Sequence, residues 1–177
     1  SQPAKEISKG YGDIILVNTN FTSGNPFSEE KYKEIQTNWG KDIRENEKRY
    51  QEELIQKFIE AVKALSQDIP SHTIIIRPHP SENHEFYREK FRETESVVVD
   101  HSGDVRSWIY ASECVIHNGC TTGIEAALLN KPVIAYEPEV QGPTTERPPL
   151  PNTVSQSVYS LQELLHQVKN YISQESH

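Results

Sequence analysis

The chain has 177 residues, enough for one domain with a sizeable core, and 34% of them are hydrophobic while 25% are charged. A formal net charge of −8 argues against a binding surface for nucleic acid or for an anionic membrane. No apolar run approaches the roughly 18 residues that a membrane span needs, and the N-terminus lacks a signal-peptide pattern. We therefore expect no nucleic-acid partner and no transmembrane segment.

Sulfur-containing residues are few. The two cysteines, Cys114 and Cys120, flank one turn without the spacing of a zinc site, which indicates reduced, buried thiols. Methionine is absent, although a translated chain begins with one, so we expect a domain excised from a larger protein. We assign residues 1–12 to a linker or disordered arm and residues 13–177 to a single domain.

Short apolar runs alternate with amphipathic segments along the chain. The apolar runs predict strands buried on both faces at 13–18, 72–76, 96–100, 114–116 and 133–136, and a short edge strand at 154–158. The amphipathic segments predict helices at 28–66 with a break near residue 40, at 83–94, 105–111 and 124–129, and from 161 to 172. This order predicts an α/β fold, a Rossmann-like, doubly wound parallel sheet with helices on both faces.

Two segments depart from the pattern of an ordinary dinucleotide-binding fold. Residues 137–152 are rich in proline, lack an apolar period and are too many for an ordinary connection, which indicates either a lid over a ligand or a disordered loop. The first strand is not followed by the G-x-G-x-x-G pattern, so we expect no classical dinucleotide site.

The turn after the 114–116 strand has the composition of an anion site. A strand that feeds a helix through a small-residue turn leaves backbone N–H groups at the helix N-terminus, where they bind phosphate. The alternative is an ordinary turn with a threonine as the helix cap. The candidates in this segment are His117, Asn118, Gly119, Thr121, Thr122, Gly123 and Glu125, the last placed to accept hydrogen bonds from ribose or sugar hydroxyls.

Polar residues also follow the first two strands. Two prolines fix the end of the 72–76 strand, where Arg77 offers a planar fork for phosphate and His79 a donor that titrates near neutral pH. The alternative is a structural arginine paired with a carboxylate and a histidine that fills a turn. Because ligands of open α/β sheets lie beyond the carboxyl ends of the strands, the further candidates are Ser81 and the cleft-facing Asn18, Asn20 and Phe21.

Three features together carry a resemblance: 15–21, Arg77-Pro78-His79-Pro80, and 117–126 with 130–136, which includes the Gly123-Ile124-Glu125-Ala126 helix start. They resemble the C-terminal half of bacterial surface carbohydrate biosynthesis proteins, which are similar to glycosyltransferases of the GT-B fold. The resemblance covers about Asp13 to Ile172 and implies one half of a GT-B fold, the half that binds the nucleotide-sugar donor. It implies that Arg77, His79 and the Thr121–Gly123 turn hold the donor phosphate, that Glu125 contacts the ribose, and that catalytic groups come from an N-terminal Rossmann-like half.

The resemblance also implies a function in synthesis of bacterial capsule or lipopolysaccharide. The expected reaction is transfer of a sugar from a nucleotide-sugar, a CMP-activated acidic sugar such as Kdo or else a UDP-sugar, to a glycan acceptor. The alternatives are a GT-B-like UDP-sugar 2-epimerase and a non-catalytic module that binds a nucleotide or phosphosugar. No Asp-x-Asp motif is present, so we expect metal-independent binding without a cofactor. The expected location is cytoplasmic, with peripheral attachment to the inner membrane through the parent protein as the alternative.

Overall fold

The computed structural model describes residues 2–35, 40–141 and 153–175. Their centre is a six-stranded parallel sheet in the order β3-β2-β1-β4-β5-β6. The strands are β1 (Ile14–Thr19), β2 (Thr73–Pro78), β3 (Val97–Val99), β4 (Ser112–His117), β5 (Val133–Tyr136) and β6 (Gln156–Val158). This order confirms the predicted Rossmann-like, doubly wound sheet, and β6 lies at its edge as expected. The strand order reverses between β1 and β4, where ligands of such sheets bind.

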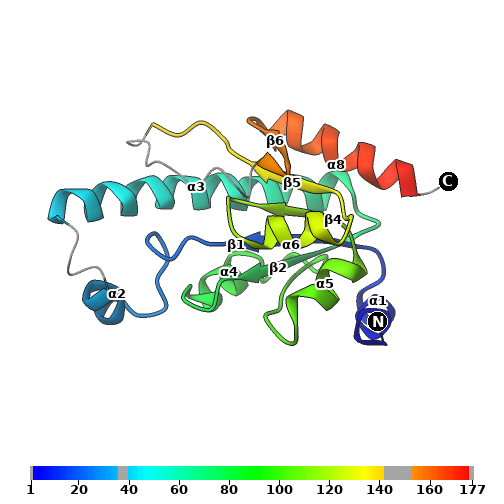
Figure 1. Cartoon of the computed structure of the whole chain (residues 1–177), viewed down its shortest axis with the longest axis horizontal. Helices are drawn as coiled ribbons and strands as arrows, with labels where there is room; N and C mark the ends of the chain where they lie inside the picture. Colours follow the sequence, from blue (N-terminus) through cyan, green and yellow to red (C-terminus); the bar gives the residue numbers. More distant parts are fainter. Residues whose placement is uncertain (1, 36–39, 142–152, 176–177) are drawn as a thin grey trace.

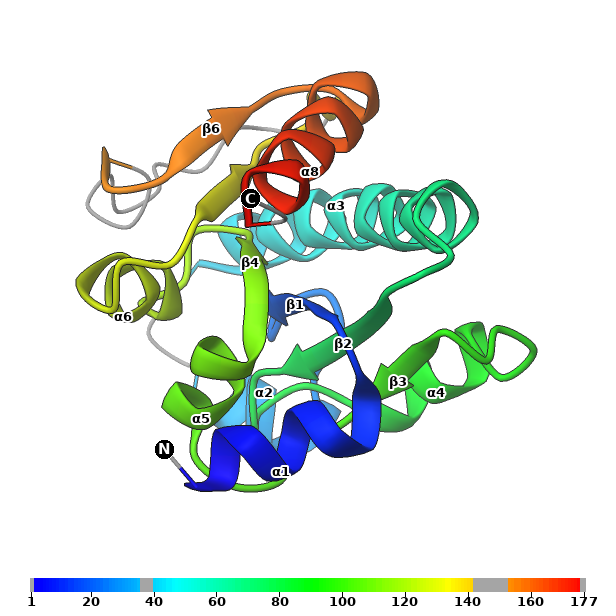
Figure 2. The same cartoon turned by 90° about the vertical axis from the view of Figure 1, so that its right-hand side faces the viewer.

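Helices cover both faces of the sheet (Figures 1 and 2). They are α1 (Gln2–Tyr11), α2 (Glu29–Ile35), α3 (Lys41–Asp68), α4 (His84–Lys90), α5 (Val105–Ala111), α6 (Thr122–Leu128) and α8 (Leu161–Glu175). The long α3 and α8 lie over one face, and α1, α5 and α6 lie over the other. The predicted break near residue 40 falls between α2 and α3.

Alternate residues of each strand contribute to two apolar cores. In β1, Ile15 and Val17 pack with Phe58 of α3, whereas Ile14 and Leu16 pack with Trp108 of α5. All four strand residues are buried, as expected for a central parallel strand covered on both faces. Burial of these apolar side chains is the main stabilisation of the fold, at about 25 cal/mol per Å² removed from water.

The expectation of a linker or disordered arm over residues 1–12 is wrong, because residues 2–11 form α1. Ala4, Ile7 and Tyr11 recur at helical spacing and pack against the face of α5. The ring centroids of Tyr11 and Trp108 lie 5.7 Å apart, and the Tyr11 hydroxyl donates to Asp100. This apolar pattern has only three positions and is surrounded by polar residues, so the sequence alone did not indicate a helix.

Phe21 is also misassigned in the sequence analysis. It is fully buried, and its ring packs edge-on against Phe58 at a centroid distance of 5.1 Å, so it belongs to the core and not to a cleft. The cysteines agree with expectation, since Cys114 and Cys120 are both buried free thiols. Most of the predicted lid or loop at 137–152 lies outside the described residues. Of the helices within the described ranges, none has the length and apolar character needed to cross a membrane.

Candidate functional site

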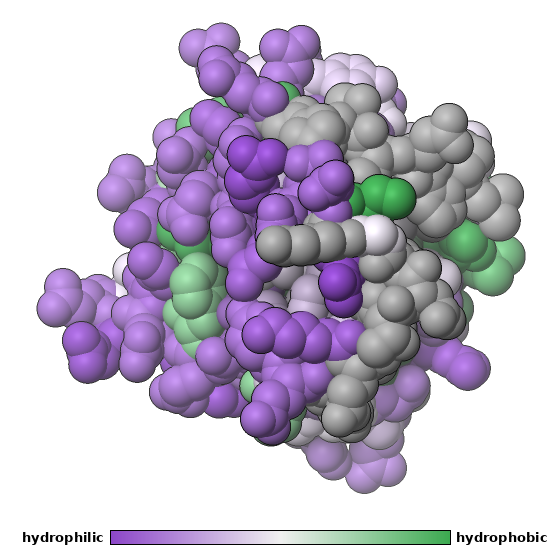
Figure 3. Space-filling view, turned by 90° about the vertical axis from the view of Figure 1, so that its left-hand side faces the viewer, coloured by the Kyte–Doolittle hydropathy of each residue, from purple (hydrophilic) through white to green (hydrophobic). Residues whose placement is uncertain are grey.

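A cavity of about 480 Å³ opens at the carboxyl ends of the strands, between β1, β2 and the turn after β4. Figure 3 looks onto this end of the molecule, where the described surface is mostly hydrophilic. The lining residues are Asn18, Thr19, Asn20, Arg77, Pro78, His79, Pro80, His101, Val105, Gly119, Cys120, Thr121 and Thr122.

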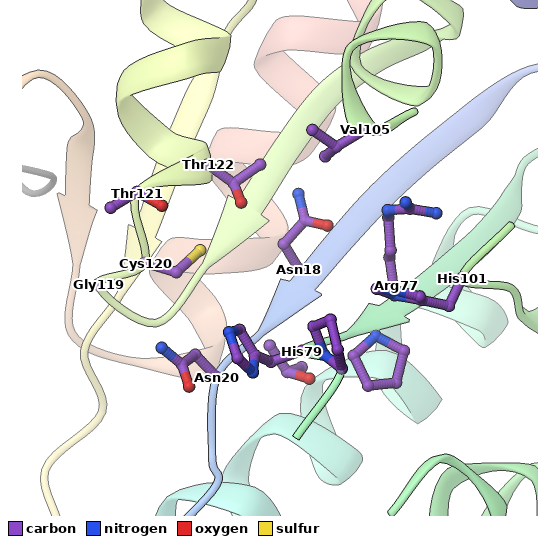
Figure 4. Close-up of a pocket in the computed structure, with 13 residues that line it drawn as sticks. Asn18, Asn20, Arg77, His79, His101, Val105, Gly119, Cys120, Thr121 and Thr122 are labelled. Atoms are coloured by element: carbon purple, nitrogen blue, oxygen red, sulfur yellow. The ribbon is translucent and has the colours of Figure 1, made fainter. Parts of the chain in front are cut away.

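Seven of the residues singled out in the sequence meet at this cavity (Figure 4). They are Asn18, Asn20, Arg77, His79, Gly119, Thr121 and Thr122. Ser81, His117, Asn118, Gly123 and Glu125 do not line it, although each lies in a segment next to a lining residue. The predicted juxtaposition of the β2 end with the α6 turn is therefore present in the fold.

A row of three polar side chains closes the core beneath this cavity. In the register of the sheet, Asn18 of β1 pairs with Arg77 of β2 on one side and with His117 of β4 on the other. These positions continue the alternation of Leu16, which faces α5. Polar groups buried in such a row need hydrogen-bond partners, and the three differ in whether they have them.

The side chain of Arg77 is hydrogen-bonded to backbone groups of the protein. Its guanidinium donates to the carbonyls of Ser102 and Gly103, both at 2.8 Å, and so holds the loop between β3 and α5. Burial lowers the pKa of Arg77, while the nearby carboxylates of Asp100 and Asp104 act in the opposite direction. Two of the five N–H donors of the guanidinium are used in this way. Arg77 thus supplies positive charge to the cavity wall from a fixed position.

His117, at the other end of the row, is fully buried and satisfied within the fold. The Gly119 N–H donates to Nδ1 at 2.9 Å, so Nε2 carries the ring hydrogen and donates to the Ser155 hydroxyl at 2.8 Å. Burial lowers the pKa of His117 to about 4. Gly123 lies directly against the ring, since a Cβ there would be 2.6 Å from Nε2. His117 and Gly123 therefore shape the turn from below, where a ligand in the cavity does not reach them.

Asn18, in the middle of the row, has a side-chain nitrogen without a hydrogen-bond partner in the described part of the chain. Its side chain is 4% exposed, and its Nδ2 has no hydrogen-bond acceptor among the described residues. Figure 4 shows the amide between Thr122 and Arg77, at the wall of the cavity. A buried amide donor left unpaired costs about 1–3 kcal/mol. Such a group beside a cavity is a candidate donor to an acceptor atom of a ligand.

His79 presents a defined donor to the same space. Its Nδ1 accepts from the Ser81 N–H at 3.2 Å, so the neutral ring carries its hydrogen on Nε2. Burial and then the neighbouring His84 lower the pKa of His79, which favours this neutral form at pH 7. The assignment of Ser81 changes accordingly: its backbone orients His79, while its side chain is outside the cavity lining.

The residue that fixes His79 is Glu82, which sequence reasoning missed. Its carboxylate is fully buried and accepts from the Thr19 hydroxyl at 2.8 Å, the His79 N–H at 2.9 Å and the Tyr87 hydroxyl at 2.6 Å. Burial raises the pKa of Glu82, and these hydrogen bonds act in the opposite direction. A glutamate directly after a Pro-His-Pro turn gives no sequence signal for this role, because its donors come from three separate elements.

The turns after β1 and β4 are joined by a reciprocal pair of hydrogen bonds between Asn20 and Asn118. Asn118 Nδ2 donates to the Asn20 carbonyl at 3.0 Å, and the Asn20 N–H donates to Asn118 Oδ1 at 2.9 Å. Asn118 therefore holds the two rims of the cavity together. Glu125 lies farther along α6, where its carboxylate is 3.9 Å from the Arg106 guanidinium of α5.

His101 is a further lining residue that the sequence analysis did not select. It lies in the loop after β3, and its Nδ1 is buried without a hydrogen-bond partner in the described part of the chain. Burial, followed by the charge of Arg77, lowers the pKa of His101. The sequence could have indicated His101, because it follows a predicted strand at the carboxyl edge of the sheet, where ligands bind.

The chemistry of the lining favours an anion with hydroxyl or carbonyl groups. None of the described lining residues is Asp or Glu, whereas Arg77, His79 and Asn18 bring a positive charge and N–H donors. Cys120 is a poor nucleophile here, because burial raises the pKa of its thiol. The lining thus has the chemistry to hold a polar anionic ligand, and in the described residues it contains no paired nucleophile and base.

Comparison with known proteins places the chain in a family. One family model, described as Protein of unknown function (DUF354), matches residues 7–145. The chain belongs to this family. A sequence comparison with curated proteins gives no match.

Three solved structures with the same fold carry names that refer to nucleotide-sugars. UDP-GlcNAc 2-epimerase from Neisseria meningitidis, bound to UDP-GlcNAc, is 15% identical with a TM-score of 0.59, over 98% of this chain and 42% of that chain. E. coli ADP-heptose lps heptosyltransferase II is 12% identical with a TM-score of 0.58, over 100% of this chain and 53% of that chain. A putative UDP-N-acetylglucosamine 2-epimerase from Listeria monocytogenes is 14% identical with a TM-score of 0.56, over 99% of this chain and 40% of that chain.

These likenesses establish the fold, a GT-B-like Rossmann half. The chain spans about half of the length of these structures or less.

Proposed function

We propose that this domain binds the phosphate portion of a nucleotide-sugar and is the donor-binding half of a GT-B-type glycosyltransferase for bacterial surface polysaccharide. The observation that carries the proposal is Asn18 Nδ2, a buried and unpaired donor at the wall of a cavity that Arg77 makes positive. Phosphate oxygens are strong acceptors, and a hydrogen bond to a charged group contributes about 1.5–3 kcal/mol.

The position of the cavity supports the same ligand. It lies where the strand order of the sheet reverses, the place at which doubly wound sheets bind their ligands. The fold-level neighbours named above include proteins bound to UDP-GlcNAc or named for ADP-heptose, so the likeness leaves the base open. Transfer would build charge on the departing phosphate, and the fixed donors of Arg77, His79 and Asn18 would stabilise that charge.

Binding is tested by thermal shift with UDP, CMP, GDP and ADP, each with EDTA present. A ligand at a hundredfold excess over its dissociation constant stabilises the fold by about 2.7 kcal/mol, which is a measurable rise in melting temperature. We expect at least one nucleotide to give this rise without a divalent cation. CMP identifies an acidic-sugar donor and UDP a hexose-type donor. No shift with any nucleotide contradicts the proposal, and a shift only with a divalent cation contradicts its metal-independent form.

The transferase and the epimerase differ in their products. In a longer protein that contains this domain, a transferase consumes the nucleotide-sugar only when a glycan acceptor is present. A 2-epimerase releases an epimer without an acceptor. Product analysis by mass spectrometry and NMR, with and without acceptor, therefore distinguishes them, and turnover in neither assay indicates a binding module.

A further inference from the structure

A second group of functional side chains lies at the opposite end of the sheet. Asp13, His72 and Glu113 each offer a ligand atom, and these atoms all lie within 4.8 Å of one another. The sheet order explains the convergence, because Asp13 directly precedes the central β1, His72 directly precedes the neighbouring β2, and Glu113 is the second residue of β4 on the other side. Figure 2 shows β1 between these two strands.

A β-bulge aims Glu113 at this group. Ile14 pairs with Ser112 and Ile15 pairs with Cys114, so Glu113 is the extra residue between two successive pairs. Bulges redirect a side chain and are over-represented next to functional sites. The redirected carboxylate lies 2.7 Å from His72 Nε2.

The other nitrogen of His72 is also held. Nδ1 lies 2.9 Å from the Ser71 hydroxyl, and the ring is buried with 6% exposure. Metal-ligating histidines almost always carry such a hydrogen bond on the nitrogen that does not bind the metal. In that arrangement Nδ1–H donates to Ser71 and the Nε2 lone pair faces Asp13 and Glu113.

The charge of the group is unbalanced. Two carboxylates face one imidazole, and in the described ranges no ion pair joins a Lys or Arg to either carboxylate. We propose that Asp13, His72 and Glu113 form a binding site for Zn²⁺ with one position open to water. Zinc takes imidazole and carboxylate ligands at about 2.0–2.2 Å, which places ligand atoms about 3.3 Å apart in a tetrahedral site. On binding, the 2.7 Å contact widens by about 0.6 Å and any of the ligand atoms that are farther apart than about 3.3 Å move closer together. The metal then links the amino ends of β2, β1 and β4.

The test is calorimetric titration of the tag-free chain, stripped with EDTA and dialysed, with ZnCl₂ and separately with MgCl₂. We expect one zinc per chain and a higher melting temperature with zinc, and no binding of magnesium, which prefers all-oxygen sites. Asp13 is exposed, so Asp13→Asn leaves the fold intact and weakens zinc binding at least about tenfold. His72→Ala abolishes binding, and Ser71→Ala weakens it about tenfold through the lost hydrogen bond to the ring.

His84→Ala is the matched control, because His84 lies near His79 and His101 in a different group of imidazoles. It leaves zinc affinity and stoichiometry unchanged. Unmeasurable zinc binding overturns the proposal. Binding that weakens in His84→Ala and persists in Asp13→Asn also overturns it, because the metal then belongs to the other histidines.

Discussion

The imidazole of His117 fills the space in which residue 123 would place a side chain. A Cβ on Gly123 would lie 2.6 Å from Nε2 and 2.8 Å from Cε1 of this ring. The ring does not yield easily, because both of its nitrogens are hydrogen-bonded. The start of α6 therefore depends on a glycine for packing, and the turn that lines the cavity depends on both residues.

Gly123→Ala is expected to destabilise the fold by about 1–3 kcal/mol, the usual cost of overpacking a closely packed site. Chemical denaturation measures the change. Gly10→Ala is the matched control, since Gly10 lies in α1 with nothing within 4 Å of the added methyl. That control is neutral or stabilising by about 0.5–1 kcal/mol. Equal stability of the Gly123 variant and the unaltered chain would contradict the packing account.

The buried His117 also predicts a loss of stability in acid. Its pKa falls from 6.5 in the unfolded chain to about 4 in the fold, so the unfolded state binds more protons between these values. The contribution is fully present above pH 6.5 and is lost as the pH falls to about 4, for a total of about 3 kcal/mol. Denaturation of the unaltered chain and of His117→Gln across this range gives the difference. Parallel pH profiles for the two proteins would rule out this role.

The Glu82 network predicts a graded series of substitutions. Glu82→Ala leaves the hydroxyls of Thr19 and Tyr87 without their acceptor and opens a cavity, at an expected cost of about 2–4 kcal/mol. Glu82→Gln costs less, because the Tyr87 hydroxyl can turn and accept from the new amide. Glu85→Ala, at an exposed position of α4, changes stability by less than about 0.5 kcal/mol. Equal effects at positions 82 and 85 would show that the network does not hold this loop.

Substitutions of Asn18 are expected to change nucleotide affinity with little effect on the stability of the fold. Asn18→Leu removes an unpaired buried donor, so we expect its stability to remain within about 1 kcal/mol of the unaltered chain or to rise. The same variant weakens nucleotide binding about tenfold to a hundredfold, and Asn18→Asp weakens it further through repulsion of phosphate. Arg77 is a poorer probe, because its replacement also releases the Ser102 and Gly103 carbonyls. Unchanged affinity in both Asn18 variants would remove this residue from the site.

The sequence predicted the layers well because the strands are short apolar runs, such as 14–17 and 74–76, whose burial follows from composition alone. It predicted the binding edge for the same reason, since the carboxyl ends of parallel strands must meet. It did not predict which polar residue is left unpaired. That depends on contacts between distant segments, such as Ser155 with His117 and the Ser102 carbonyl with Arg77.

The predictions that were wrong or missing also concern contacts between segments that are distant in the sequence. Phe21 follows a strand in a polar turn, and only its contact with Phe58 of α3 identifies it as a core residue. The helix at 2–11 is stabilised by Trp108, about a hundred residues away. The hydrogen bonds of Glu82 and the bulge at Glu113 likewise depend on strand register and on packing between distant segments, which no local sequence pattern predicts.

An NMR titration of the ¹⁵N-labelled domain with the nucleotide that gives the largest thermal shift tests the central claim most directly. The account predicts saturable shifts of the Asn18 side-chain amide and of the backbone amides from Gly119 to Thr122, with EDTA present. Shifts confined to other surfaces, or an Asn18 amide that does not move at saturation, would contradict it.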